Sequence, residues 1–184
     1  MFHRSLFISL LLLLALAAPA LAQDNAPRVA VANVDGPIVA VVADYLDRAI
    51  ASAEQSGANA LVVQLNTPGG DVGSTLRIIQ RFASARVPII VYVTPRRAQA
   101  ASAGSIITLG AHLSAMSPET IIGAAKPISG SGEDLNSDAR DKAINDLRAT
   151  MRTLTRHRGE KAMEWAEKAI SEAVAATEEE ALKL

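Results

Sequence analysis

The chain has 184 residues, of which 49% are apolar and 20% charged, so it is long enough to form one domain with a hydrophobic core. Its formal net charge is −1 and only 3% of its residues are aromatic, which excludes the basic or ring-rich surface of a nucleic-acid-binding protein. The absence of cysteine excludes disulfides, thiol catalysis and thiolate metal ligands.

The N-terminal residues are typical of an export signal. A short basic start precedes an apolar run over residues 7–18, and small residues at 20–22 suit a cleavage site. Twelve helical residues span about 18 Å, less than the hydrocarbon core of about 30 Å. We therefore predict a signal peptide over 1–22, a mature domain over 23–184, and export to the periplasm or the extracytoplasmic face of the membrane. An uncleaved membrane anchor is the alternative.

Strands and helices alternate along the mature chain. The β-branched run 28–34 predicts a strand, and apolar residues at helical spacing from Ile38 to Ile50 predict a helix after it. The same criteria predict strands over 60–65, 87–93, 113–116 and 121–125, and helices over 72–85, 102–111, 140–158 and 161–175. This alternation favours an α/β fold with a mostly parallel sheet, built from right-handed βαβ units with flanking helices.

Two further segments have local signals. Residues 129–141 are rich in glycine, serine and acidic residues and predict a mobile loop beside the functional site. Thr177 and Glu180 have the spacing of a capping box, which predicts a last helix close to the end of the chain. Because a domain rarely stops one turn into a helix, we expect the chain to be truncated at its C-terminus.

One serine stands out among residues with almost no side chains. Ser102 lies in the run Gln99–Ser105, which follows the predicted strand 87–93, and a second small-residue turn, Asn66–Gly70, follows the strand 60–65. Because functional sites of parallel α/β sheets form outside the carboxyl ends of the strands, we expect these turns to meet. One turn then supplies a nucleophile and the other supplies bare backbone N–H donors.

A serine nucleophile needs a base, and histidine is the first candidate. His112 follows Ser102 by ten positions, or about 15 Å of helix, and His157 lies at a polar helix end, so both are predicted to be structural. A neutral lysine is the other option, and the candidates are Lys142 and Lys126. Spacing alone is equally consistent with two solvated surface lysines.

An oxyanion hole is easier to argue from the residues. The N–H of Ala103 follows the serine at a helix start, where it has no partner within the helix, and Gly70 in the other turn supplies a second donor. The tripeptide Pro68–Gly70 by itself is also common in ordinary strand-to-helix turns.

Four segments in this order resemble the NfeD-type membrane-bound serine proteases of the ClpP/crotonase superfamily. They are Leu65–Gly70, Ala100–Gly104, Gly110–Met116 and Ile122–Ala125, and the resemblance covers residues 29–184. It implies a ClpP/crotonase-like fold and a Ser-Lys dyad without metal or organic cofactor.

Within that resemblance, Ser102 is the nucleophile and Lys142, at the start of the helix after the loop, is the base. The oxyanion donors map onto Gly70 and Ala103. Lys126 lies 24 positions after Ser102, near the place where the ClpP branch has its catalytic histidine, so it is a substrate-binding residue or the alternative base. An extended substrate is expected to add a strand beside Gly69–Gly70.

The resemblance also implies substrates and partners. The substrates are apolar segments of membrane-associated proteins, with a stomatin-like membrane protein as the partner. We expect a homo-oligomer, with the apolar helices from residue 143 onward as the contact. Two alternatives stay open: a crotonase-like acyl-CoA enzyme that uses the same N–H donors for an enolate, and a non-catalytic scaffold that binds a stomatin-like membrane protein. No CoA phosphate site is evident, and export argues against the first.

Overall fold

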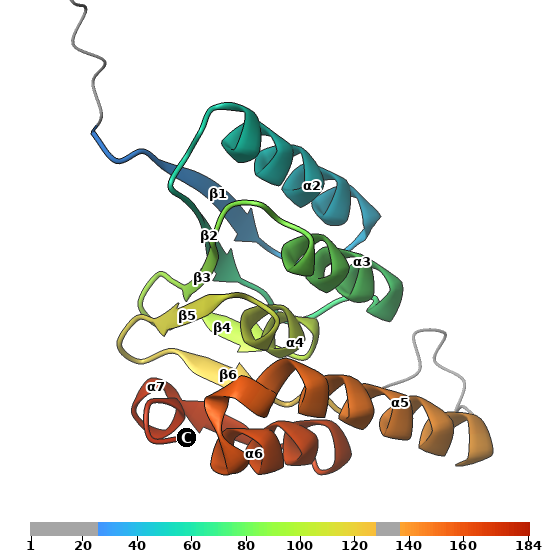
Figure 1. Cartoon of the computed structure of the whole chain (residues 1–184). Helices are drawn as coiled ribbons and strands as arrows, with labels where there is room; N and C mark the ends of the chain where they lie inside the picture. The colour runs from blue at the N-terminus through green and yellow to red at the C-terminus, as the bar shows by residue number, and fades with distance from the viewer. Residues whose placement is uncertain (1–25, 128–136) are drawn as a thin grey trace, which may run out of the picture.

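The computed structural model of the chain describes residues 26–127 and 137–184 (Figure 1). Its larger sheet holds four parallel strands in the order β1-β2-β3-β5, rich in β-branched and aliphatic residues. These strands are β1 (Val29–Asp35), β2 (Ala60–Asn66), β3 (Ile89–Val93) and β5 (Leu113–Met116). The helices α2 (Ala40–Gln55) and α3 (Val72–Ala83) connect the first three strands and lie on the same face of the sheet. The predicted α/β fold with a mostly parallel sheet is confirmed.

A second, smaller sheet continues from the carboxyl ends of the first. It contains β4 (Gln99–Ala101), β6 (Ile121–Gly123) and β7 (Ala175–Thr177), with β4 parallel and β7 antiparallel to β6. A bridge between Thr67 and Ala100 joins the two sheets. The sequence predicts neither β4 nor β7, because both are three-residue strands whose alanines give no strand periodicity.

The second half of the chain adds helices that pack around the smaller sheet (Figure 1). Helix α4 (Ala103–Leu109) precedes β5, and α5 (Ser137–Thr155), the 3-10 turn η1 (Arg156–Arg158), α6 (Glu160–Ser171) and α7 (Glu178–Ala181) follow β6. All seven residues of α4 are buried, as its apolar and small residues predict. The capping box at the start of α7 is confirmed.

The predicted loop over 129–141 is wrong at its C-terminal end. Helix α5 already begins at Ser137, and Asp138 in its first turn interacts favourably with the helix dipole. The rest of that loop lies outside the described residues, and so does the predicted signal peptide. No helix in 26–127 or 137–184 combines the length and the hydropathy that crossing a bilayer requires.

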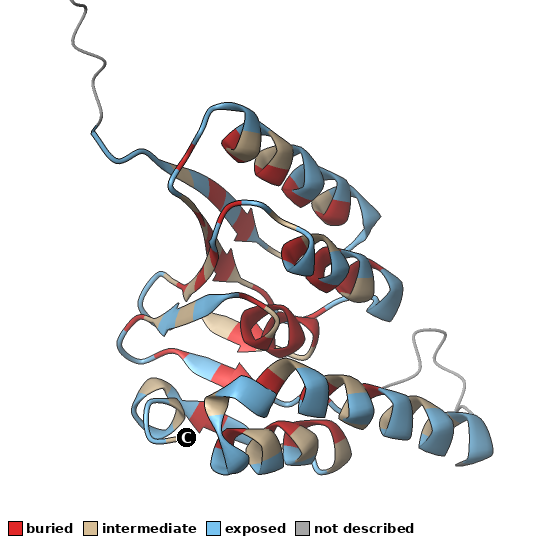
Figure 2. Cartoon of the chain, viewed as in Figure 1, coloured by how far each residue is buried: buried red, intermediate tan, exposed pale blue. Residues whose placement is uncertain are grey.

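The core lies between the larger sheet and its helices, where Figure 2 shows buried residues on the inner faces of α2 and α3. The buried face of α2 differs in part from the one that its apolar spacing predicts. Val41 and Tyr45 are exposed, whereas Ala43 and Ala53 are buried. A second cluster joins α4, α5 and α6 through Leu109, Met151, Ile170 and their neighbours. The apolar residues of α5 are therefore used inside the protomer.

The opposite face of the larger sheet is open to solvent in the part of the chain that the structure describes. One row across it is apolar: Val31 pairs with Val62, Val62 with Ile90, and Ile90 with Leu113. Val31 and Leu113, at the two ends of the row, are 61% and 60% exposed. This is unusual, because parallel sheets are normally covered on both faces.

Candidate active site

The structure brings the two small-residue turns into contact, as the sequence predicts. A Cβ atom built on Gly69 would lie 2.7 Å from the Cβ of Ser102 and 3.2 Å from its Oγ. Gly69 itself has a φ of +121°, in the region that favours glycine. The Cα of Gly69 therefore lies against the serine side chain, and no other residue fits there without displacing it.

Ser102 has a strained backbone. Its φ of 53° and ψ of −116° lie outside the regions that non-glycine residues normally occupy, at the junction between β4 and α4. The N–H of Ser102 donates to the carbonyl of Gly123 at 2.8 Å, and its own carbonyl accepts from the Ser105 hydroxyl at 2.8 Å. Strain of this kind persists only where surrounding contacts hold it, and it is concentrated at functional sites.

The Ser102 side chain is only partly buried, and its hydroxyl has no hydrogen-bond partner among the described residues. A sharp strand-to-helix turn places a side chain at the tip of the turn, with the helix N-terminus behind it. The geometry thus presents a free hydroxyl next to N–H groups that have no partner within the helix.

Two backbone N–H groups near this hydroxyl are available. The N–H of Ile38 donates to the carbonyl of Gly69 at 2.8 Å, and the N–H of Asp71 donates to the carbonyl of Ile38 at 2.9 Å. In a parallel pairing of this kind, the N–H of the intervening Gly70 points away from Ile38. The N–H of Ala103, in the first turn of α4, likewise has no acceptor within the described residues.

Buried contacts hold both turns in place. The Thr67 hydroxyl accepts the N–H of Gly69 at 3.1 Å and lies 3.2 Å from the Gly69 carbonyl. A Cβ on Gly104 would lie 2.5 Å from the Thr67 Cγ2, so α4 approaches this turn as closely as its backbone allows. The N–H and the carbonyl of Gly69 already take part in hydrogen bonds within the protein. We therefore expect Gly69 to leave space for a substrate and not to bind it through hydrogen bonds.

Neither histidine reaches the serine. His112 Nδ1 accepts the N–H of Ile89, the first residue of β3, whose far end leads toward the site. His157 is exposed in the 3-10 turn η1. The structural roles predicted for both are consistent with these positions.

The two candidate lysines lie on different segments. Lys126 follows β6, the strand that pairs with β4 so that Gly123 faces Ala101, and it leaves the sheet at the end where Ser102 lies. Lys142 lies in the second turn of α5. Both side chains are exposed, and neither ammonium group has a hydrogen-bond or ion-pair partner among the described residues. The structure therefore forms the serine and the N–H donors but does not join a lysine to Ser102.

Two positioning residues were not predicted. Thr67 stands in the quoted small-residue turn, but only the fold shows that its buried hydroxyl closes that turn. Gly123, with a φ of +127°, accepts the N–H of Ser102 and has no room for a Cβ, which would lie 2.4 Å from the Val174 carbonyl. No group of three or more metal-ligating side chains occurs within 26–127 or 137–184.

Comparison with known proteins gives consistent matches. The family model for the N-terminal domain of NfeD1b matches residues 28–184. The membrane-bound protease PH1510 of Pyrococcus horikoshii is 40% identical over 181 residues, which is 98% of this chain and 40% of that protein. The membrane protein NfeD1b of Bacillus subtilis is 28% identical over 144 residues, which is 78% of this chain and 32% of that protein. The chain thus spans less than half the length of these curated relatives.

Solved structures give the same picture. One is a mutant of the 1510-N membrane-bound stomatin-specific protease with a serine replaced by alanine, and another is a mutant with a lysine replaced by alanine, in complex with a substrate peptide. Each has a TM-score of 0.77, 39% sequence identity and a match to 85% of this chain. The matches cover 76% and 72% of those chains, respectively.

Proposed function

Because this chain belongs to the family of NfeD1b N-terminal domains, we propose that it is a serine endopeptidase with a Ser-Lys dyad. Ser102 is the nucleophile, and Lys142 is the general base. Gly70 and Ala103 donate their N–H groups to the oxyanion, and Lys126 binds the substrate beside the open approach at Gly69.

The proposed reaction gives each of these residues one step. Neutral Lys142 takes the proton of the Ser102 hydroxyl as its oxygen attacks the peptide carbonyl. The two N–H donors stabilise the negative charge of the tetrahedral intermediate, at about 3–4 kcal/mol for one donor. Lys142 then passes the proton to the leaving amine, and water hydrolyses the acyl-enzyme.

The observation that carries the proposal is the strained backbone of Ser102, which places its hydroxyl against Gly69 beside two N–H groups that have no acceptor in 26–127 or 137–184. The choice of lysine has separate support. In the 1510-N relatives, the replaced serine and lysine are 41 positions apart. Lys142 follows Ser102 by 40 positions, one fewer than in the relatives, and Lys126 follows it by 24, so of these two lysines Lys142 has the similar separation.

The relatives also guide the proposed substrate and location. PH1510 is a membrane-bound protease, and 1510-N is described as specific for a stomatin homolog, so we propose a stomatin-like membrane protein with an apolar segment as substrate and partner. We further propose a cleaved signal peptide over 1–22, an extracytoplasmic location for residues 23–184, and a homo-oligomer. Protease accessibility in intact and permeabilised cells tests the location.

A fluorophosphonate probe tests the nucleophile directly. We expect one labelled residue, Ser102, when the labelled protein is digested and mapped by mass spectrometry. Ser102→Ala should lose labelling and cleavage of an apolar peptide, whereas Ser84→Ala, at an exposed helix end, should keep both. Lys142→Ala should be as inactive as Ser102→Ala. Labelling elsewhere, or an active Ser102→Ala variant, would refute the proposal.

A non-catalytic scaffold is the second candidate, and the exposure of both lysines favours it. A scaffold would bind the stomatin-like partner equally well with and without the Ser102 hydroxyl, and it would not react with the probe. Labelling of Ser102 that depends on Lys142 excludes the scaffold. If labelling depends on Lys126 instead, Lys126 and not Lys142 is the general base.

A further inference from the structure

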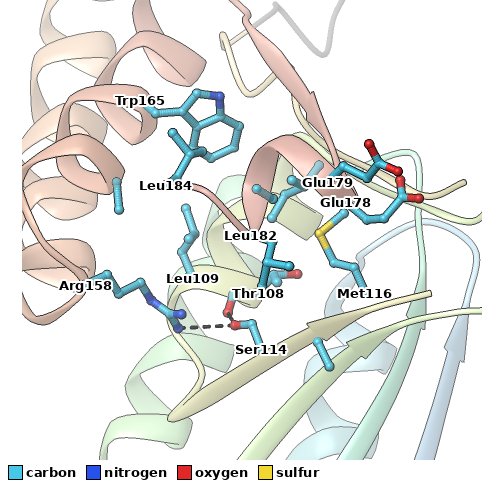
Figure 3. Close-up of a pocket in the computed structure, with 14 residues that line it drawn as sticks. Thr108, Leu109, Ser114, Met116, Arg158, Trp165, Glu178, Glu179, Leu182 and Leu184 are labelled. Carbon is cyan, nitrogen blue, oxygen red and sulfur yellow. Dashed lines mark hydrogen bonds between the residues drawn. The ribbon is translucent and has the colours of Figure 1, made fainter. Parts of the chain in front are cut away.

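A cavity lies at the end of α4 that is remote from Ser102. It has a volume of about 410 Å³ and is lined by α4, β5, β6, η1, α6, α7 and the residues that follow α7 (Figure 3). Its contact with α4 is through Thr108 and Leu109, at the end opposite Ser102, which is about 10 Å of helix away. The cavity is therefore separate from the proposed protease site.

Most of its wall is apolar. The aliphatic and aromatic groups that line it come from every enclosing element except η1: Leu109, Ala115, Met116, Ile122, Ala162, Trp165, Ala181, Leu182 and Leu184. Leu182 on this wall is 89% exposed, which is high for a leucine unless something covers it. The volume falls within the range of small-molecule sites, about 300–1,000 Å³.

The cation in the wall is Arg158. One of its terminal nitrogens donates to the carbonyl of Ala111 and to the hydroxyl of Ser114, each at 3.2 Å. Its Nε is buried and has no hydrogen-bond partner. No carboxylate lies within ion-pair distance of it in the described residues, and burial lowers the pKa of its guanidinium. An arginine stays charged in proteins, so this guanidinium is a half-buried cation without a counter-ion.

The polar groups of the cavity restrict which ligand can bind in it. Figure 3 shows Arg158 and Ser114 on one side, and Glu178 and Glu179 on the other. An anionic head group is attracted to the first side and repelled from the second. The Ser114 hydroxyl already donates to the Thr108 carbonyl at 2.6 Å, so it offers the occupant little.

The rest of the occupant must be apolar without polar groups of its own. A peptide would bring an N–H and a carbonyl for each residue, and unpaired amides against this wall are costly. An alkyl chain has none of these groups and removes apolar wall from water. We propose that the cavity binds the carboxylate of a medium-chain fatty acid, with the head group on Arg158 and the alkyl chain along Leu109, Met116 and Trp165.

Trp165 makes this testable, because it is the only tryptophan in the chain and it lines the cavity. We expect dodecanoate, titrated below its micelle concentration into the full chain, to change the Trp165 fluorescence in a saturable way. Dodecanol has the same alkyl chain without the charge and should bind at least tenfold more weakly. No saturable change with dodecanoate, or equal affinity for both ligands, would overturn the proposal.

Two variants separate the guanidinium from general charge and from folding. Arg158→Gln should weaken dodecanoate binding at least tenfold, whereas Arg156→Gln, two residues away and exposed, should bind like the unmodified chain. Should Arg158→Gln fail to fold, Ala181→Phe adds a ring at a half-buried position on the α7 side of the cavity and should abolish the fluorescence change. Undiminished binding in a folded Arg158→Gln variant, or in Ala181→Phe, contradicts the site.

Discussion

At position 102, a serine occupies backbone angles that favour glycine, and this conflict can be measured. Holding a non-glycine residue at such sparsely populated angles costs about 1–3 kcal/mol. Ser102→Gly should relieve that strain and so stabilise the folded protein. The greater freedom of glycine in the unfolded chain offsets about 0.4–1 kcal/mol of this gain. We therefore expect Ser102→Gly to be more stable than Ser102→Ala by about 1 kcal/mol in urea denaturation, although both lack the nucleophile. Equal or reversed stabilities would show that the strain is absent.

Gly69 allows a test of the contact between the two turns. Gly69→Ala should lose at least tenfold in probe labelling, because the new Cβ would lie 2.7 Å from the Ser102 Cβ and must displace it. Gly36→Ala is a matched control. Gly36 has a φ of +122°, almost the same as +121° at Gly69, but a Cβ there meets nothing within 4 Å. If both variants label equally poorly, backbone strain and not the contact with Ser102 explains the loss.

Between α2 and α3, one carboxylate is held by several donors. Glu54 accepts from the Arg81 guanidinium at 3.1 Å and from the N–H of Arg86 at 2.9 Å, and its side chain is only 9% exposed. The hydrogen bond from Arg81, followed by that from Arg86, lowers the pKa of Glu54. A lowered folded-state pKa contributes stability above the unfolded value of about 4.3, and this stability is lost as the pH falls through the folded value.

Glu54→Gln should therefore destabilise the protein at neutral pH and matter less in acid. We expect a loss of about 1–2 kcal/mol at pH 7, measured by urea denaturation, and a smaller difference below about pH 4. The control is Asp44→Asn, whose ion pair with Arg77 is half exposed and should contribute about 0–1 kcal/mol. A Glu54→Gln difference that stays constant from pH 7 to pH 3 contradicts this account.

The elements differ in how far the sequence predicts them. The strands β1, β2, β3 and β5 have β-branched and aliphatic runs that are readable locally, and α4 is readable as a buried helix from its small residues. The short strands β4 and β7 form only because they pair with β6, which is a contact between distant segments. The sequence predicts the start of α5 three residues late, because glycine, serine and acidic residues suit both a loop and a first helical turn.

The candidate site divides in the same way. Composition and spacing predict Ser102, Gly69, Gly70 and Ala103 as site residues, since small residues after two parallel strands meet at one edge of the sheet, and the structure brings the two turns into contact. The φ of Ser102 and the closing bonds of Thr67 and Gly123 depend on which backbones approach each other, so no local pattern encodes them. The position of Lys142 relative to Ser102 likewise depends on tertiary structure and not on spacing.

For the whole molecule, the arrangement of apolar surface bears on the proposed homo-oligomer. The sequence points to the helices from residue 143 onward as the contact, but their apolar residues pack against α4 inside the protomer. The open sheet face is a better candidate, because its row from Val31 to Leu113 is apolar and uncharged, so two copies could meet there without repulsion between like charges. Two sheets can stack face to face across such rows.

A charge placed in that row should separate the copies. Val31→Glu and Leu113→Glu lie at positions 61% and 60% exposed, so each should cost the isolated protomer little stability, yet each would bury a carboxylate between stacked sheets. We expect a lower mass by light scattering for either variant, with an unchanged melting temperature. Val41→Glu is the control, because Val41 is 65% exposed on α2, away from the row. If Val41→Glu dissociates the oligomer and the row variants do not, the contact lies on the helical face, and the bare sheet is covered by something other than a second copy.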